Sequence, residues 1–252
     1  MNRNERWLLN EKYGGVATAD YETDRRRLAH GEPLAYVIGW QPFLDLTIHL
    51  DSSPLIPRPE TEWWTDQMLT ALTNRETING PTRERPTRIL DLCAGSGAIG
   101  CAALARIPNA HVYFGEIDPA HETTILKNIR ENGLDGASAD VRTGDLFAPF
   151  SDMRFDRIAI NPPYVPAGRE LPRSVADHEP PLALYAGKDG LAVIRRISEE
   201  LPRRMAEKGE AWIEVDSAQT ETARELFAAR GMSARTRTDQ YGKPRVVVVS
   251  FS

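Results

Sequence analysis

Short runs of hydrophobic residues alternate along this chain with longer stretches in which apolar residues recur every three or four positions. The runs that predict strands are Arg88–Cys93, His111–Ile117, a segment leading into Arg142–Phe147, Arg154–Ile160, Glu210–Asp216 and Arg245–Phe251. The stretches that predict helices are Gly97–Ile107, Pro119–Asn132, Asp189–Gly209 and Ala218–Gly231. This alternation of strands and helices predicts an α/β fold, in which helices cover both faces of a mostly parallel sheet.

The first third of the chain has a different pattern. Residues Ala35–Leu50 alternate apolar and polar side chains around a Gly and a Pro, which predicts a β-hairpin. Residues Glu60–Leu72 carry large apolar side chains at every fourth position, which predicts a helix. Residues Asn74–Arg88 are polar, contain Gly and Pro and show no periodicity, so we expect a linker or surface loop there.

Composition and charge narrow the functional classes. The 252 residues are 41% hydrophobic and 27% charged, as in ordinary globular proteins. The chain has neither an apolar run long enough to span a bilayer nor a signal peptide, so we expect a cytoplasmic protein with no membrane partner, and a monomer. A net charge of −5 argues against a nucleic-acid partner. Two cysteines, Cys93 and Cys101, are too few for a complete four-Cys zinc site, and we expect no metal.

A glycine-rich turn follows the first strand of the α/β part. Gly95 and Gly97 allow the backbone to turn sharply and to approach a ligand closely at the start of the next helix. The spacing differs from the Gly-x-Gly-x-x-Gly pattern of dinucleotide sites. Asp91 precedes this turn and would repel a phosphate, so the turn favours a cationic ligand.

Carboxylates also end the next two strands. Glu116 stands at a strand tip, where a carboxylate can accept hydrogen bonds from both hydroxyls of a ribose. Asp118 is a second candidate, although we favour it as the N-cap of the following helix. Asp145 can accept from an adenine amino group beside Leu146, or it is a solvated turn residue. A positive centre, a ribose and an adenine together describe S-adenosylmethionine, whereas NAD fits less well.

The segment Asn161–Tyr164, Asn-Pro-Pro-Tyr, ends another strand. Pro163 holds Pro162 extended, so that the Pro162 carbonyl points outward beside the Asn161 side-chain oxygen. Two adjacent acceptors match the two N–H bonds of a planar amino group, and Tyr164 can stack on that group. Such a nitrogen is a poor nucleophile, and accepting both N–H bonds orients it for methylation.

With these motifs in view, the sequence resembles the HemK/PrmC family, the protein-(glutamine-N5) methyltransferases of peptide-chain release factors within the class I methyltransferases. Three further segments carry the resemblance: Gly31–Phe43 (GEPLAYVIGWQPF), Leu55–Glu62 (LIPRPETE) and His178–Leu191 (HEPPLALYAGKDGL). It implies a Rossmann-like, seven-stranded, mostly parallel sheet with an antiparallel last strand, preceded by a β-hairpin. It also implies methyl transfer from S-adenosylmethionine, with S-adenosylhomocysteine as product, to the Gln of a Gly-Gly-Gln loop.

The resemblance also assigns domains and residues. We expect a shortened helical N-terminal segment over 1–30, a β-hairpin linker over 31–60 and the S-adenosylmethionine-dependent domain over 61–252. The expected catalytic residues are Asn161, Pro162 and Tyr164, and Pro163 joins them in substrate binding. The expected cofactor-binding residues are Asp91, Ala94, Gly95, Gly97, Glu116, Asp145, Leu146, Asn161 and Arg58.

Other functions share parts of this pattern. The same Asn-Pro-Pro-Tyr motif suits a ribosomal-protein glutamine methyltransferase. It also suits an adenine-N6 methyltransferase acting on RNA or DNA, because adenine N6 presents a similar planar amino group. A cofactor-binding scaffold without catalysis is the alternative outside the enzymes.

Overall fold

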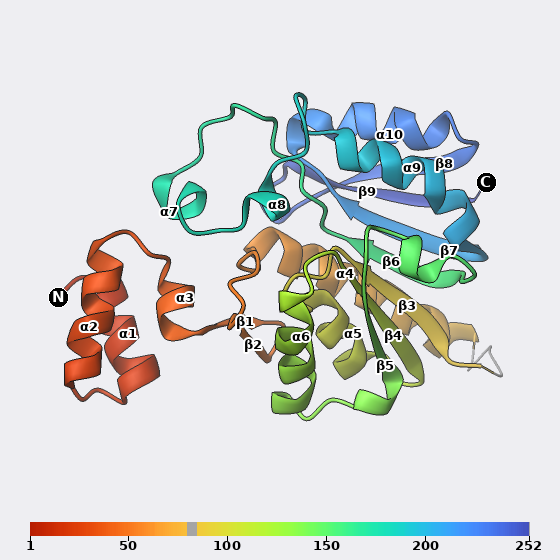
Figure 1. Cartoon of the computed structure of the whole chain (residues 1–252). Helices are drawn as coiled ribbons and strands as arrows, with labels where there is room; N and C mark the ends of the chain where they lie inside the picture. Colours follow the sequence, from red (N-terminus) through yellow and green to blue (C-terminus); the bar gives the residue numbers. More distant parts are fainter. Residues whose placement is uncertain (80–84, 252) are drawn as a thin grey trace.

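The computed structural model describes residues 1–79 and 85–251, and a seven-stranded sheet forms the centre of the larger part of them (Figure 1). Its strands are β3 (Thr87–Leu92), β4 (Ala110–Glu116), β5 (Ala139–Thr143), β6 (Phe155–Ile160), β7 (Met205–Glu214), β8 (Met232–Thr238) and β9 (Pro244–Phe251). They lie in the order β5-β4-β3-β6-β7-β9-β8, and β9 runs antiparallel to both of its neighbours. The expected mostly parallel sheet with a reversed last strand is therefore confirmed.

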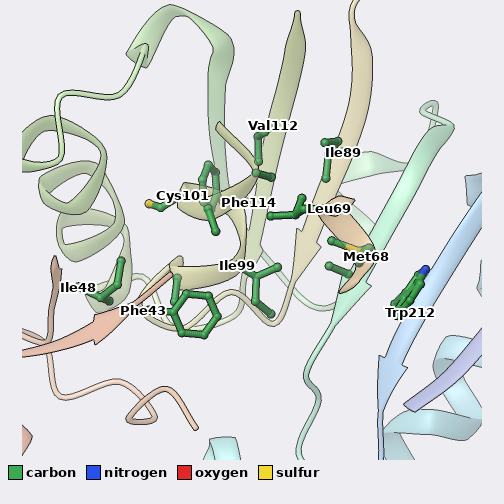
Figure 2. Close-up of a cluster of buried hydrophobic side chains, with 14 of the residues drawn as sticks. Phe43, Ile48, Met68, Leu69, Ile89, Ile99, Cys101, Val112, Phe114 and Trp212 are labelled. Carbon is green, nitrogen blue, oxygen red and sulfur yellow. The ribbon is translucent and has the colours of Figure 1, made fainter. Parts of the chain in front are cut away.

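Helices cover both faces of this sheet, as the alternating pattern predicted. One face carries α4 (Pro59–Asn79), α5 (Ala98–Arg106) and α6 (Ala120–Glu131), and the other carries α9 (Ala192–Arg204) and α10 (Thr220–Ala228) (Figure 1). Figure 2 shows the hydrophobic core on the face that carries α4, α5 and α6. There Phe43 of the hairpin and Met68 of α4 pack with Phe114 and Trp212 of the sheet. The shorter helices are α7 (Arg173–Ala176), α8 (Pro181–Leu184) and the 3-10 turns Gly136–Ser138, Ala148–Phe150 and Ser217–Gln219.

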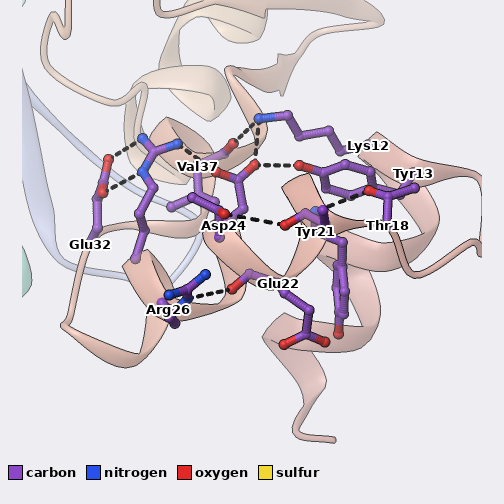
Figure 3. Close-up of polar contacts among 12 residues, drawn as sticks. Lys12, Tyr13, Thr18, Tyr21, Glu22, Asp24, Arg26, Glu32 and Val37 are labelled. Atoms are coloured by element: carbon purple, nitrogen blue, oxygen red, sulfur yellow. Dashed lines mark hydrogen bonds and ion pairs between the residues drawn. The ribbon is translucent and has the colours of Figure 1, made fainter.

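Three helices precede the hairpin: α1 (Arg3–Tyr13), α2 (Ala19–Ala29) and α3 (Leu34–Ile38). They enclose a small core of their own around Leu8 and Tyr21. The carboxylate of Asp24 lies between the helices and accepts from Lys12 Nζ at 2.7 Å and Tyr13 Oη at 2.8 Å (Figure 3). These contacts lower the pKa of Asp24 against the raising effect of its burial. The helices therefore form a packed unit beside the sheet.

The hairpin of β1 (Trp40–Phe43) and β2 (Leu46–His49) is confirmed, and it docks on α6 through amide side chains. Asn132 accepts from Thr47 N and donates to Thr47 O, both at 2.9 Å. Asn128, four residues earlier, pairs with the N–H and carbonyl of His49 at 2.7 and 3.1 Å. Four helical residues rise about 6 Å and two strand residues about 6.6 Å, so the two amides imitate a neighbouring strand.

Several boundaries differ from the sequence expectations. Ala35–Ile38 lies in α3 rather than in the hairpin, and α4 continues to Asn79 into the expected linker, of which residues 80–84 lie outside the described ranges. The helix expected over Asp189–Gly209 ends at Arg204, because Met205 already pairs with Phe155 in the sheet. Within the described residues, no helix combines the length and hydropathy needed to cross a membrane.

Candidate active site

A cavity opens at the carboxyl ends of β3, β4 and β6, where a sheet of this kind binds ligands. The empty space within it amounts to about 880 Å³, which includes space open to solvent. The expected site residues that line it are Gly95, Glu116, Asp145, Leu146, Asn161 and Pro163. The expected residues outside its lining are Asp91, Ala94, Gly97, Arg58, Pro162 and Tyr164.

Asp91 acts behind the glycine turn rather than in the cavity. Its Oδ2 accepts from the backbone N–H of Gly100 at 2.8 Å, which fixes the first turn of α5. Complete burial raises the pKa of Asp91 well above its usual range; the Gly100 hydrogen bond opposes this rise, and the nearby Glu116 charge adds to it. Among the described residues its buried Oδ1 has no hydrogen-bond partner. This oxygen is therefore an acceptor left open for a hydrogen-bond donor.

The two glycines of the turn have conformations that other residues adopt with strain. Gly95 and Gly97 have φ values of 55° and 77°. A Cβ atom on Gly97 would lie 3.1 Å from Cγ2 of Ile125 in α6, so this glycine also permits close packing of α5 on α6. Gly95 instead faces the cavity, with its N–H directed to Glu116.

Glu116 is held tightly at the tip of β4. Its Oε2 accepts from Gly95 N at 2.7 Å, and its Oε1 accepts from Ile117 N at 2.8 Å and Asp118 N at 2.9 Å. A carboxylate offers about four acceptor sites, so about one remains for a ligand. Asp118 also lines the cavity while its Oδ1 accepts from Ala120 N at the start of α6. Pro119, and not Asp118 as expected, is the N-cap of α6, although Asp118 still accepts from the first residue of the helix, and its other oxygen is a second acceptor beside Glu116.

The far side of the cavity is formed by Asp145, Leu146 and α9. Asp145 is ion-paired with Arg196 of α9, with Oδ2 and Nη2 2.6 Å apart, and both side chains are half-exposed. Leu146 is buried and has a φ of 46°. Leu146 and Val193 thus give this end of the cavity an apolar wall with a carboxylate at its edge.

Asn161 ends β6 with its side chain at the cavity. Its Nδ2 donates to Thr61 Oγ1 of α4 at 3.2 Å, and in the described ranges its Oδ1 accepts no hydrogen bond. The ring of Tyr164 lies behind the loop, where its hydroxyl donates to Glu214 Oε1 at 3.0 Å. Burial, together with the Glu214 charge, raises the pKa of Tyr164 well above its usual range. The motif therefore presents an amide oxygen to the cavity and directs its phenol hydroxyl to the buried Glu214.

The segment His178–Leu191 braces the Asn-Pro-Pro-Tyr loop from outside. Val165 N donates to Leu184 O at 2.8 Å, and Ala186 N donates to Val165 O at 2.9 Å. Gln219 Nε2 joins the two segments by donating to Tyr164 O at 2.9 Å and to Asp189 O at 3.0 Å. Backbone pairing thus fixes the loop beyond the rigidity of its prolines.

Arg58 anchors the segment Leu55–Glu62, which borders the cavity at Leu55. Its Nη2 donates to Glu179 Oε1 at 2.5 Å, and the other oxygen of Glu179 accepts from Ile56 N at 3.2 Å. Glu179 is almost fully buried, whereas Arg58 is partly exposed. Two segments singled out in the sequence, Leu55–Glu62 and His178–Leu191, are therefore bound to each other across the cavity.

Replacing Arg58 by methionine is expected to lower the free energy of unfolding by about 1–2 kcal/mol, because Glu179 would stay buried without its cation. It should also weaken binding of S-adenosylhomocysteine, measured by calorimetry, because Leu55 loses its anchor. Arg58→Lys is the control and should retain most of both. If Arg58→Met and Arg58→Lys lost equal stability and equal affinity for S-adenosylhomocysteine, the positive charge at this position would not be the cause of either loss.

Several lining residues were not anticipated from the sequence. They are Leu55, Leu92, Cys93, Gly115, Ile117, His121, Gly144, Pro180, Leu182, Ala183, Val193 and Arg196. Four of them, Leu55, Pro180, Leu182 and Ala183, belong to the segments Leu55–Glu62 and His178–Leu191. The sequence therefore singled out these segments but did not predict that these residues line the cavity. His121 and Arg196 come from helix faces, and a single helical residue gives no local sign that it faces a ligand.

The character of the cavity suits a cationic nucleoside without phosphate. Three carboxylates, Glu116, Asp118 and Asp145, face one guanidinium, Arg196, across apolar walls. The N–H of Gly95 in the turn donates to Glu116, and the N–H of Gly100 in α5 donates to Asp91, so neither is directed to a phosphate. Among residues 1–79 and 85–251, no cluster of three or more His, Cys, Asp or Glu side chains is placed to hold a metal.

Known proteins resemble this chain in sequence and in fold. Residues 69–177 match the family model of the methyltransferase small domain. A release factor glutamine methyltransferase of Mycolicibacterium smegmatis is 33% identical over 86% of this chain and 74% of its own length. The one of Agrobacterium fabrum is 35% identical over 86% and 73%. The Thermus thermophilus 16S rRNA N2 G1207 methyltransferase, solved with AdoMet and guanosine, shares the fold with a TM-score of 0.52 and 19% identity, covering 84% of this chain and 50% of that one.

Proposed function

Because this chain belongs to the release factor glutamine methyltransferase family, we propose that it transfers a methyl group from S-adenosylmethionine to the side-chain amide nitrogen, N5, of a release-factor glutamine. The observation that carries the proposal is the orientation of Asn161. Its Nδ2 is committed to Thr61, so its Oδ1 is the acceptor that faces the cavity. A glutamine side-chain amide offers the N–H donors that such an acceptor needs.

Asn161 and Pro162 together hold the substrate amide in this proposal. Asn161 Oδ1 and the Pro162 carbonyl accept the two N–H bonds, which fixes the nitrogen and favours localisation of its lone pair. The Tyr164 hydroxyl donates to the buried Glu214, so we assign Tyr164 to holding the loop rather than to stacking on the substrate.

The cofactor is assigned to the acidic cavity. Glu116 and Asp118 bind the ribose hydroxyls, and Asp145 and Leu146 bind the adenine. The carboxylates that line the cavity, together with the Asp91 oxygen that has no hydrogen-bond partner among the described residues, offer acceptors to the positive end of the molecule. When bound, S-adenosylmethionine supplies an electrophilic methyl group and is released as S-adenosylhomocysteine. A release-factor substrate would place the protein in the cytoplasm, where peptide chains are terminated.

The test is a methylation assay with labelled cofactor. We expect a release factor with an intact Gly-Gly-Gln motif to be labelled and the variant with Ala in place of this Gln to stay unlabelled. Ribosomal protein and bulk RNA are assayed in parallel. Equal labelling of the two release factors, or labelling of RNA or ribosomal protein alone, would overturn the proposal.

A further inference from the structure

A completely buried carboxylate, Glu214, lies at the end of β7 behind the Asn-Pro-Pro-Tyr loop and outside the cavity lining. Its Oε2 accepts from Thr61 Oγ1 and from Trp64 Nε1, both at 2.7 Å, and its Oε1 accepts from Tyr164 Oη at 3.0 Å. Thr61 and Trp64 are on α4, so the Glu214 side chain links α4, β7 and the Asn-Pro-Pro-Tyr loop.

The chemistry of these partners fixes the direction of each hydrogen bond. An indole N–H can only donate, so the atom of residue 214 that faces Trp64 must be an acceptor. The same oxygen takes the single hydroxyl proton of Thr61. The lone pairs of Thr61 Oγ1 then remain for a donor, and the Nδ2 group of Asn161 lies 3.2 Å away. If the Asn161 amide were turned over, two acceptors would face each other at this distance.

We propose that Glu214 and Thr61 are positioning residues, a relay that sets the orientation of the Asn161 amide so that its oxygen faces the substrate. This inference rests on the function proposed above, in which Asn161 Oδ1 accepts an N–H of the substrate amide. Neither relay residue lines the cavity. An amide rotated by 180° would present N–H groups to the N–H groups of the substrate, which is a repulsive arrangement. The relay therefore favours the orientation in which Asn161 Oδ1 accepts from the substrate amide over the one in which Asn161 Nδ2 would repel it.

The chain offers a matched set of variants. Thr61→Val keeps the shape of the side chain and removes the hydroxyl, whereas Thr61→Ser keeps the hydroxyl. Thr65, one turn further along α4, is equally buried, and its hydroxyl has no hydrogen-bond partner among the described residues. Thr65→Val therefore measures the cost of a Thr-to-Val change in this helix without touching the relay.

We expect Thr61→Val to lower kcat for release-factor methylation about tenfold or more, because the acceptor is no longer held in its productive orientation. The affinity for S-adenosylhomocysteine should change less than about twofold, since the relay lies outside the cavity. Thr61→Ser and Thr65→Val should retain kcat within about threefold of the parent protein. Equal kcat for Thr61→Val and Thr65→Val, or equal losses for Thr61→Val and Thr61→Ser, would overturn the proposal.

A second readout needs no substrate. In protein with ¹⁵N-labelled asparagine, the Asn161 side-chain amide should exchange slowly in the parent protein and in Thr61→Ser, and faster in Thr61→Val. Unchanged exchange in Thr61→Val would contradict the relay even if the parent protein methylates a release factor. Conversely, a parent protein that leaves release factors unmethylated while showing the expected exchange pattern would reject the proposed function and support the relay.

Discussion

Replacing Asn161 by alanine is expected to lower kcat for glutamine methylation by about 10²–10³-fold, the usual effect of removing one preorganised hydrogen-bonding group from an active site. The side-chain oxygen is the acceptor that β6 delivers to the cavity. Without it the substrate nitrogen keeps only the Pro162 carbonyl, and its orientation is lost. Single-turnover measurement with labelled cofactor reports the methyl-transfer step directly.

Because Asn161 lines the cavity, the affinity of Asn161→Ala for S-adenosylhomocysteine must be measured as well. Binding of S-adenosylhomocysteine should weaken far less than kcat falls; equal losses would identify Asn161 as a cofactor ligand alone. Adding Thr61→Val to Asn161→Ala gives a double-mutant cycle. Because Thr61 acts through Asn161, the double variant should be no slower than Asn161→Ala, whereas additive losses would show that Thr61 acts independently.

Replacing Gly190 by alanine is expected to lower the free energy of unfolding by about 3 kcal/mol and to reduce methylation at least tenfold. Gly190 has a φ of 76°, and a Cβ atom there would lie 2.2 Å from the Tyr164 carbonyl oxygen and 2.4 Å from Gln219 Nε2. The carbonyl belongs to the backbone of the substrate loop, so relief of the clash must displace that loop. Chemical denaturation and the methylation assay measure the two effects.

Gly168→Ala is the matched control for this change. Gly168 also has a positive φ, 89°, and a Cβ atom there would meet nothing within 4 Å. It should therefore show only the backbone strain of about 1 kcal/mol and near-normal activity. If the two alanine variants lose equal stability and activity, the contact between Gly190 and the Tyr164 carbonyl does not hold the loop.

The fold was largely predictable because its helices and strands have strong local patterns. The strands β3, β4, β6 and β9 are apolar runs, and their alternation with helices predicts a mostly parallel sheet, whereas the reversed last strand was expected only from the family resemblance. The strand β8 was not identified from its pattern because it is a polar edge strand, with Arg235 and Arg237 among its residues. The end of α9 was misjudged because Met205–Gly209 has helical composition, whereas its pairing with β6 is a tertiary effect.

The site was predictable where its chemistry lies in one short segment. The glycine turn, the strand-tip carboxylates and Asn161–Tyr164 were all visible as motifs. The roles of Thr61 and Glu214 were not visible, although Thr61 belongs to the segment Leu55–Glu62. Thr61 contacts Asn161 from α4 and Glu214 contacts Thr61 from β7, and the local sequence of a buried Thr or Glu does not indicate its partner. Asp91 and Arg58 were noticed as residues of the site, yet the structure places them behind the cavity lining.

The amide docking of the hairpin on α6 gives the N-terminal part of the chain a junction that chimaeras can reuse. The backbone of β2 is recognised by Asn128 and Asn132, and Phe43 and Ile48 of the hairpin are buried in the core that α4, α5 and the sheet share. An exchange of everything before Leu50 with the equivalent portion of a relative would keep this junction where the two asparagines and the residues packed around Phe43 and Ile48 are retained. Such chimaeras would pair one catalytic core with different N-terminal units, and so test whether those units affect substrate choice.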